Sequence, residues 1–208
     1  MRKKVNPFWF TLSVLLCLAA FALCLIAGRG GVLYLHPDGD PQDVVTFFFN
    51  SIVAGEYQSA YACLSDYSGL GLENEPDSGT GRTLYDALRR SYGFTISEDC
   101  RVDRLEAVQP VLFRYLDVKA VETQIAARVE DIAAELVAER PAPEIYDEEG
   151  AYLASFTDEV YATALDEVLR DETDYYSTVP LELSLRYNGR AWEIQTSPAL
   201  FTALLGGV

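Results

Sequence analysis

The chain has 208 residues and a formal net charge of −16, because 32 acidic side chains outnumber 16 basic ones. Half of the residues are hydrophobic, which excludes an intrinsically disordered chain. A surface of this charge repels nucleic acids and anionic lipid headgroups, so we expect neither as a partner.

The first feature along the chain is residues 8–27, an uncharged stretch that follows Arg2, Lys3 and Lys4. At about 1.5 Å per residue, a helix of this length crosses the roughly 30 Å hydrocarbon core of a bilayer. The basic flank indicates that the N-terminus stays in the cytoplasm and that everything after the stretch lies on the other side. The sequence therefore predicts a single-pass protein of the cell membrane, held there by its N-terminal helix.

A cleaved signal peptide is the alternative for this stretch. Signal peptides have a shorter apolar region of about 7–15 residues and a cleavage site of the small-x-small type. Cleavage after Ala27 would place Leu25 where a small residue usually lies. We therefore favour a retained anchor and expect four parts: a cytoplasmic tail (1–7), the anchor (8–27), a linker (28–40) and an extracytoplasmic domain (41–208).

Helices are predicted at the start of the extracytoplasmic domain. Asp40 is a suitable N-cap and Gly55 ends the apolar run, so we expect a helix over 41–54. A short helix over 56–64 and a loop rich in glycine and polar residues follow. A third helix is expected to begin with Thr83 as its N-cap.

Strands are expected in the middle of the domain. Residues 111–118 are mostly β-branched, aromatic or leucine and form a run too short for a typical helix, so we predict a central strand there. Residues 101–108 predict a weaker strand, and Pro110 between the two marks a turn, a bulge or a strand start. Because side chains alternate along a strand, Tyr115 and Asp117 are expected to share one face.

The pattern then changes to two amphipathic helices, which we expect to form a hairpin inserted between strands over 121–175. Four residues widen the apolar face of the second helix: Leu153, Tyr161, Leu165 and Leu169. Packing of the two helices on each other and on the sheet would satisfy most of this face. The alternative is an interface with another protein of the cell envelope or with a second copy of the chain, and it makes the hairpin the predicted functional surface.

The strongest local signal is a pair of terminal strands. Residues 181–187 alternate between apolar and polar, and Asn188-Gly189 is a preferred two-residue hairpin turn. A two-residue turn sets the register and places Leu185 opposite Trp192. A short helix is expected to end the chain.

The domain carries a recognisable pattern at both ends: P-x-D-V-V-x-x-F-F from Pro41, Gly55-Glu56-Tyr57, Ala60-Tyr61, Asn188-Gly189, Trp192 and Ile194. In this pattern it resembles the nuclear transport factor 2-like superfamily, and the chain is similar to small membrane-anchored or lipoprotein ectodomains of Gram-positive bacteria. The resemblance implies an α+β fold with one curved antiparallel sheet and helices on its concave side, often around a cone-shaped cavity. Some members are isomerases or dehydratases, and many only bind. The hairpin over 121–175 departs from this pattern.

The resemblance suggests where a site would lie. Phe113, Tyr115 and Trp192 are candidates for lining the cavity, and Asp117 with Tyr115 is the candidate catalytic pair of a carboxylate and a phenol. The alternative for these residues is packing in the core or exposure to solvent. The sole histidine, His36, lies in the linker, so we expect no nucleophile–histidine pair within the domain.

Cys63 and Cys100 are the cysteines outside the anchor. In an oxidising compartment they either form a disulfide that closes about 38 residues or remain separate buried thiols, and the sequence leaves both alternatives open. Neither belongs to a CxxC motif, so we expect no metal site and no cofactor. The sequence thus predicts a membrane-anchored extracytoplasmic binding or protein-interaction module, with an isomerase- or dehydratase-like enzyme as the alternative.

Overall fold

The computed structural model describes residues 39–68, 70–77 and 79–208. The predicted tail and anchor and nearly all of the predicted linker lie outside these residues. Among the described residues, none of the helices is both long enough and apolar enough to cross a bilayer. The described chain has the expected α+β fold, with one open antiparallel sheet packed with helices.

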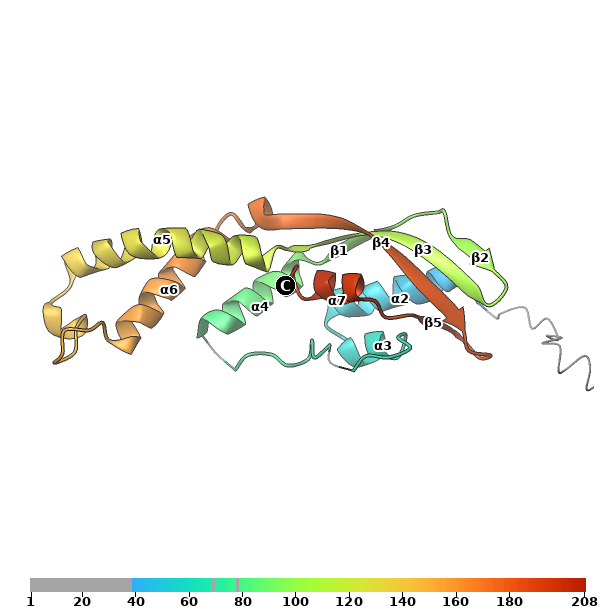
Figure 1. Cartoon of the computed structure of the whole chain (residues 1–208), viewed down its shortest axis with the longest axis horizontal. Coiled ribbons are helices and arrows are strands. Elements are labelled where there is room, and N and C mark those ends of the chain that lie inside the picture. The colour runs from blue at the N-terminus through green and yellow to red at the C-terminus, as the bar shows by residue number, and fades with distance from the viewer. Residues whose placement is uncertain (1–38, 69, 78) are drawn as a thin grey trace, which may run out of the picture. The chain divides into compact units, whose positions relative to one another are not determined.

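The described residues contain five strands in one sheet (Figure 1): β1 (Gly93–Ile96), β2 (Arg101–Asp103), β3 (Glu106–Leu116), β4 (Tyr176–Tyr187) and β5 (Trp192–Ile194). The two long strands, β3 and β4, form the central pair, from Glu106 opposite Arg186 to Leu116 opposite Tyr176. β1 and β2 both pair with the other edge of β3, and β5 pairs with the end of β4.

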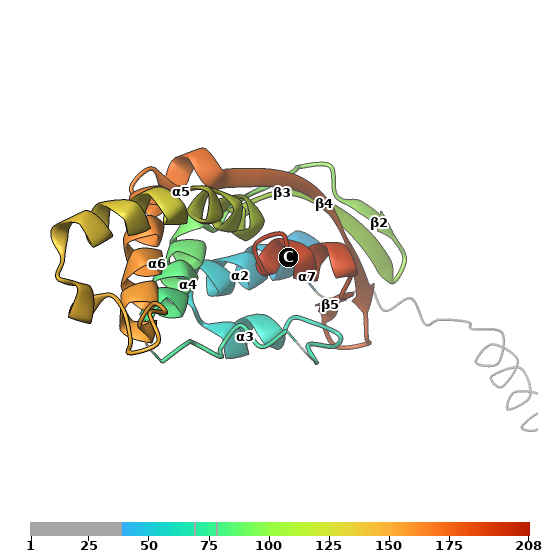
Figure 2. The same cartoon turned by 60° about the vertical axis from the view of Figure 1, so that its left-hand side comes forward.

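Side chains alternate between a buried and an exposed face along the central pair. From Leu181 to Tyr187, the odd-numbered residues of β4 are buried and the even-numbered ones are exposed. Figure 2 shows that β3 and β4 curve around the helices on the buried side. The alternation predicted for 181–187 is confirmed.

Pro110 lies inside β3 and does not interrupt it, so the predicted central strand begins earlier than expected and ends at Leu116. The carbonyl oxygen of Pro110 accepts a hydrogen bond from the Ser97 N–H at 3.1 Å. The N and C=O of one strand residue point to the same side, so the Pro110 nitrogen faces the gap between the short strands β1 and β2. A missing N–H costs little there.

The helices that accompany the sheet are α2 (Pro41–Ala54), α3 (Tyr57–Tyr61), α4 (Gly79–Ser91) and α7 (Pro198–Leu204). α2 has the predicted bounds: the Asp40 carboxylate accepts the Gln42 N–H at 2.9 Å, and Gly55 ends the helix with a φ of 75°. α4 begins before Thr83, so the prediction of Thr83 as its N-cap was wrong. The Thr83 hydroxyl lies 3.5 Å from the carbonyl oxygen of Gly79, within the first turn of α4.

The first hydrophobic core, which we call the sheet core, fills the space between the buried face of the sheet and α2, α3 and α7. Aromatic rings make up its centre. Phe49 of α2 lies 5.0 Å from the ring of Phe48 and 5.2 Å from the rings of both Phe94 and Phe113. The sheet core is therefore assembled from elements far apart in the sequence.

Between β3 and β4 the chain forms a helical hairpin, in the region where the sequence predicts one. Its elements are α5 (Val118–Glu139), the 3-10 turn η1 (Ala142–Glu144), α6 (Ala154–Leu169) and the 3-10 turn η2 (Glu172–Tyr175). The hairpin has a second core, the hairpin core, whose buried members are Ala87, Leu116, Val121, Ile125, Ile132, Ile145, Phe156, Val160, Ala164, Leu165 and Val168. Leu88 of α4 packs against both cores, so α4 joins the two regions.

The connection between β4 and β5 has four residues, 188–191, and the predicted two-residue turn was wrong. The Asn188 side-chain oxygen accepts the N–H groups of Arg190 and Ala191 at 2.9 and 3.0 Å, which stabilises the longer loop. Tyr187 now lies opposite Trp192. The register has moved by two residues, and because strand side chains alternate with a period of two, the same residues remain buried.

Candidate functional site

The predicted cavity-lining residues are part of the sheet core. Phe113 is completely buried, and its ring lies 5.5 Å from Tyr92 and 6.2 Å from Tyr115. Trp192 is buried as well, and its indole N–H donates to the Gly39 carbonyl oxygen at 3.2 Å. At these positions the concave side of the sheet is filled by packed rings.

Asp117 does not lie on a strand, so its predicted position beside Tyr115 on one strand face was wrong. It is the N-cap of α5, where its carboxylate accepts the Ala120 N–H at 2.9 Å. The hydroxyl of Ser177 lies 3.4 Å from the other carboxylate oxygen. Burial, and then the charge of Asp117, raise the pKa of the Tyr115 phenol, which therefore stays protonated at neutral pH.

The two cysteines are free thiols in the structure. Cys63 is buried just after α3, and its sulfur lies 3.7 Å from the carbonyl oxygen of Ser59. Cys100 is half-buried against the sheet core. Burial raises the pKa of both thiols, and the Asp40 carboxylate adds to the rise at Cys100. Both are therefore weak nucleophiles at neutral pH.

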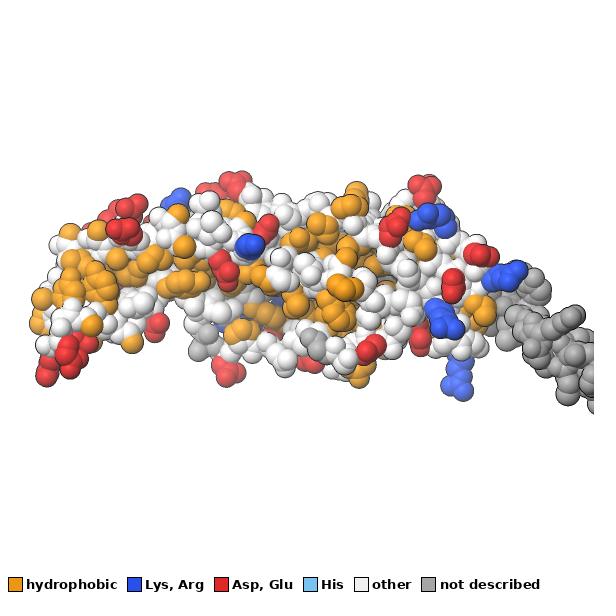
Figure 3. Space-filling model, in the orientation of Figure 1, with side chains coloured by type: hydrophobic (Ala, Val, Ile, Leu, Met, Phe, Trp, Pro, Cys, Tyr) orange, Lys and Arg blue, Asp and Glu red, His pale blue; other side chains and the backbone are white. Residues whose placement is uncertain are grey.

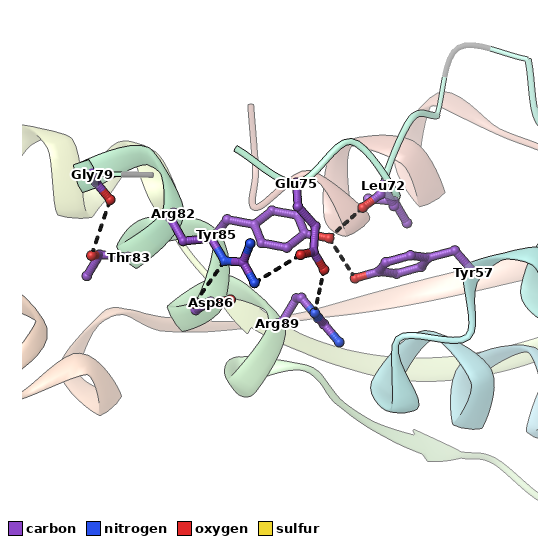
Figure 4. A network of polar contacts seen from close by, with 9 residues as sticks. All are labelled: Tyr57, Leu72, Glu75, Gly79, Arg82, Thr83, Tyr85, Asp86 and Arg89. Atoms are coloured by element: carbon purple, nitrogen blue, oxygen red, sulfur yellow. Dashed lines mark hydrogen bonds and ion pairs between the residues drawn. The ribbon is translucent and has the colours of Figure 1, made fainter. Parts of the chain in front are cut away.

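A network of tyrosine, arginine and glutamate side chains ties the loop before α4 to α3 and α4 (Figure 4). The Glu75 carboxylate forms ion pairs with the guanidinium groups of Arg89 at 2.9 Å and Arg82 at 3.0 Å. The Tyr85 hydroxyl donates to the Leu72 carbonyl oxygen at 2.6 Å and lies 3.1 Å from the Tyr57 hydroxyl. Because a phenol has a single proton, the Tyr57 hydroxyl donates to Tyr85.

This network has a structural role. Burial raises the pKa of Tyr85, so its phenol stays protonated and is not a base at neutral pH. The guanidinium of Arg89 lies 5.7 Å from the centre of the Tyr57 ring and 5.8 Å from that of Tyr85. A Cβ atom at Gly55 would collide with this guanidinium. The network holds the loop against the helices, and the sequence analysis missed it because its members belong to three separate segments.

The four predicted interface residues are divided between core and surface. Leu165 is 1% exposed and belongs to the hairpin core, so its prediction as an interface residue was wrong. Leu153 and Leu169 are half-buried against the same core, and Tyr161 is 37% exposed. α4 packs against α6, so less of the apolar face of α6 is exposed than the sequence predicts.

A second apolar surface, which the sequence analysis did not single out, lies on the hairpin. Ile125 and Ile132 of α5 are buried, whereas Val129 and Leu136, on the same helical stripe, are only half-buried. We define the hairpin face as Val129, Ala133, Leu136 and Val137 of α5 with Tyr152 and Leu153 before α6. All except Tyr152, which is 50% exposed, are half-buried against the hairpin core. Figure 3 shows hydrophobic side chains along the hairpin, with acidic groups at its margins.

The negative charge of the domain is concentrated on the hairpin. Residues 118–175 contain 16 acidic and four basic side chains, a net charge of −12. The other residues from 39 onward contain 15 acidic and eight basic side chains, a net charge of −7. Two of the four basic residues are already paired, Arg128 with Glu167 at 3.0 Å and Arg140 with Glu159 at 2.6 and 2.5 Å.

An open hollow of about 390 Å³ lies beside α7 and is lined by Thr196, Ser197, Pro198, Phe201, Thr202, Leu205 and Val208. In the part of the chain that the structure describes, no three His, Cys, Asp or Glu side chains gather closely enough to hold a metal ion.

Comparison of the chain with known protein families, with curated proteins and with solved structures finds no match.

Proposed function

We propose that this protein is a membrane-anchored extracytoplasmic module of the bacterial cell envelope that binds another protein through its helical hairpin. The observation that carries the proposal is the hairpin face, where apolar side chains of α5 remain only partly buried on the most acidic part of the domain. Exposed apolar surface with a polar rim is typical of interaction sites.

Membrane anchoring is supported by the sequence. Residues 8–27 are uncharged and follow three basic residues. The order of the N-terminal helices and the antiparallel strands supports our assignment of the domain to the nuclear transport factor 2-like superfamily, and the hairpin between β3 and β4 is an addition to that pattern.

Binding is favoured over catalysis because the candidate catalytic groups have other roles. An isomerase or dehydratase of this type needs a carboxylate and a phenol that face an open cavity. Here the Asp117 carboxylate caps α5, and Tyr115 is buried among the rings of the sheet core. Both side chains therefore have structural roles.

Site-specific photo-crosslinking of the full chain in living cells tests this function. A photoreactive amino acid replaces Val137 on the hairpin face or, as the matched control, Leu112, which is 50% exposed on the outer face of the sheet. We expect a discrete protein adduct from position 137 and none from position 112. Adducts from both positions, or from neither, would contradict the proposal. Protease added outside protoplasts should digest the domain, and a protected domain would contradict the topology.

A further inference from the structure

We infer that the partner presents a cationic amphipathic helix, which packs on the hairpin face as a further helix beside α5. The inference rests on the proposed function and names the chemistry of the partner. Two observations carry it: the incomplete cover of the hairpin core and the sign of the charge around it.

The hairpin core is incompletely covered because two antiparallel helices bury only the stripes that face each other. α4 adds a third helical surface to this core through Leu84, Ala87 and Leu88. Val129, Ala133, Leu136 and Val137 of α5 nevertheless stay only partly buried. They recur at the spacing of one helix face, which is the surface that an amphipathic helix recognises with its own residues at i, i+3, i+4 and i+7.

The same end of the hairpin offers aromatic contact area. Tyr152 stacks on Tyr146 with ring centres 5.3 Å apart, and its other neighbour is Phe156 at 5.1 Å. The Leu153 N–H donates to the Ile145 carbonyl oxygen at 2.9 Å, which fixes the approach of this segment to α6. A tyrosine that is held in place and half exposed gives a binding surface that loses little entropy when it is covered.

Charge selects the partner. On the circumference of α5, at about 100° per residue, Glu130 lies beside Val137 and Glu139 beside Leu136, and both carboxylates are exposed. The hairpin as a whole has a net charge of −12, and two of its four basic residues, Arg128 and Arg140, are already paired with α6. A helix that carries lysine or arginine along the edges of its apolar stripe matches these carboxylates and the charge of the hairpin.

Other occupants fit the charge less well. A second copy would bring a hairpin of net charge −12 against another of the same charge. Nucleic acid and anionic lipid carry the same sign as the hairpin and are repelled. A cationic helix has the complementary charge and the complementary apolar stripe.

The test measures binding of synthetic peptides to the full chain in zwitterionic nanodiscs, with empty discs as the reference. The probe is a peptide of about 18 residues with leucines along one helix face and lysines on the other. Two matched peptides serve as controls: one has the same composition in scrambled order, and one has glutamate in place of lysine. We expect the amphipathic lysine peptide to bind roughly tenfold more tightly than the scrambled one, and the glutamate peptide not to bind.

Variants locate the site. Val137→Ser and Leu136→Ser should each weaken binding of the lysine peptide several-fold, while Leu112→Ser on the sheet should leave it unchanged, with thermal melts to confirm that all three variants fold. Equal binding of the scrambled and amphipathic peptides would reduce the effect to general charge attraction and overturn the inference. Unchanged binding by both serine variants would place the site elsewhere and overturn it as well.

The outcomes also separate this inference from the proposed function. If the peptides fail to bind while crosslinking at position 137 still yields an adduct, the hairpin is an interaction surface for a partner of different chemistry. If both experiments fail, the proposed function fails too.

Discussion

The two cores of this domain differ in how they are built and in how completely they are closed. The sheet core joins α2, α3, α7 and the strands β1, β3, β4 and β5 around packed aromatic rings, and Phe48, Phe49 and Phe113 are completely buried in it. The hairpin core is mostly aliphatic, comes largely from one continuous segment, and leaves Val129 and Leu136 only partly buried. We therefore expect the sheet core to supply most of the stability and the hairpin core to offer the accessible surface.

The largest expected effect is in the sheet core. Phe113→Ala removes a ring that contacts Phe49, Tyr92 and Tyr115, and it should lower the free energy of unfolding by about 4 kcal/mol. Leu112→Ala, next to it on the exposed face, is the control and should cost less than about 1 kcal/mol. Denaturant melts measure both. Equal losses would remove the distinction between the buried and exposed faces of the sheet.

A charge in the hairpin core should have the next largest effect. Leu165→Asp buries a carboxylate without a partner, and we expect a loss of about 3 kcal/mol, limited by local opening of the hairpin. Leu169→Asp, at a half-buried position, should cost clearly less. Hydrogen exchange should show the added opening in α5 and α6 and not in β3 and β4. If Leu165→Asp left stability unchanged, the hairpin core would not be packed as described.

Gly55 tests the link between the sheet region and α4. Gly55→Ala forces an alanine into a left-handed backbone and against the Arg89 guanidinium, and should cost about 2 kcal/mol. Gly150→Ala is the matched control, because Gly150 has a similar φ of 82° but open space around it. The difference between the two thermal shifts measures the crowding at Arg89. Equal shifts would show that the arginine moves away without cost.

Asp117 lies where the sheet passes into the hairpin, and its role as a cap predicts a smaller effect. Asp117→Ala should lose about 1 kcal/mol in a denaturant melt, whereas Asp117→Asn, which keeps an acceptor for the Ala120 N–H, should be close to wild type. If Asp117 had no capping role, both variants would have the stability of wild type, and that result would contradict the prediction.

The smallest expected effect comes from the ion pair that joins α5 to α6. The hydrogen bond from Arg140 lowers the pKa of Glu159 below its ordinary value. Its stabilising contribution is therefore present above the unfolded pKa of about 4.3 and is lost as the pH falls through the lower folded value. The stability difference between wild type and Glu159→Gln, followed by thermal melts, should shrink over that acidic range and in high salt. A difference that grew in acid would contradict this assignment.

The sequence by itself determined the features that depend on neighbouring residues. Asp40 and Gly55 mark the ends of α2 because capping is satisfied within a few residues. Alternation predicts the buried face of β4. The helical period predicts one apolar stripe on α5, Val121, Ile125, Val129, Ile132 and Leu136, and the structure buries Val121, Ile125 and Ile132 of it. The anchor over 8–27 stays a prediction, which rests on length and charge.

Only the tertiary structure decided features that depend on distant segments. Leu165 and Leu169 look alike in the sequence, yet one is buried and the other half-buried in a core to which α4, a distant segment of the chain, also contributes. The hydrogen bond from the Ser97 N–H to the Pro110 carbonyl oxygen shows on which side of β3 the Pro110 nitrogen lies. That side has no partner among the described strands at this point, so β3 continues through the proline. Glu75, Tyr57 and Arg89 meet only when three segments come together. Local periodicity specifies which side of an element is apolar, but the neighbour that covers that side is set by contacts across the fold.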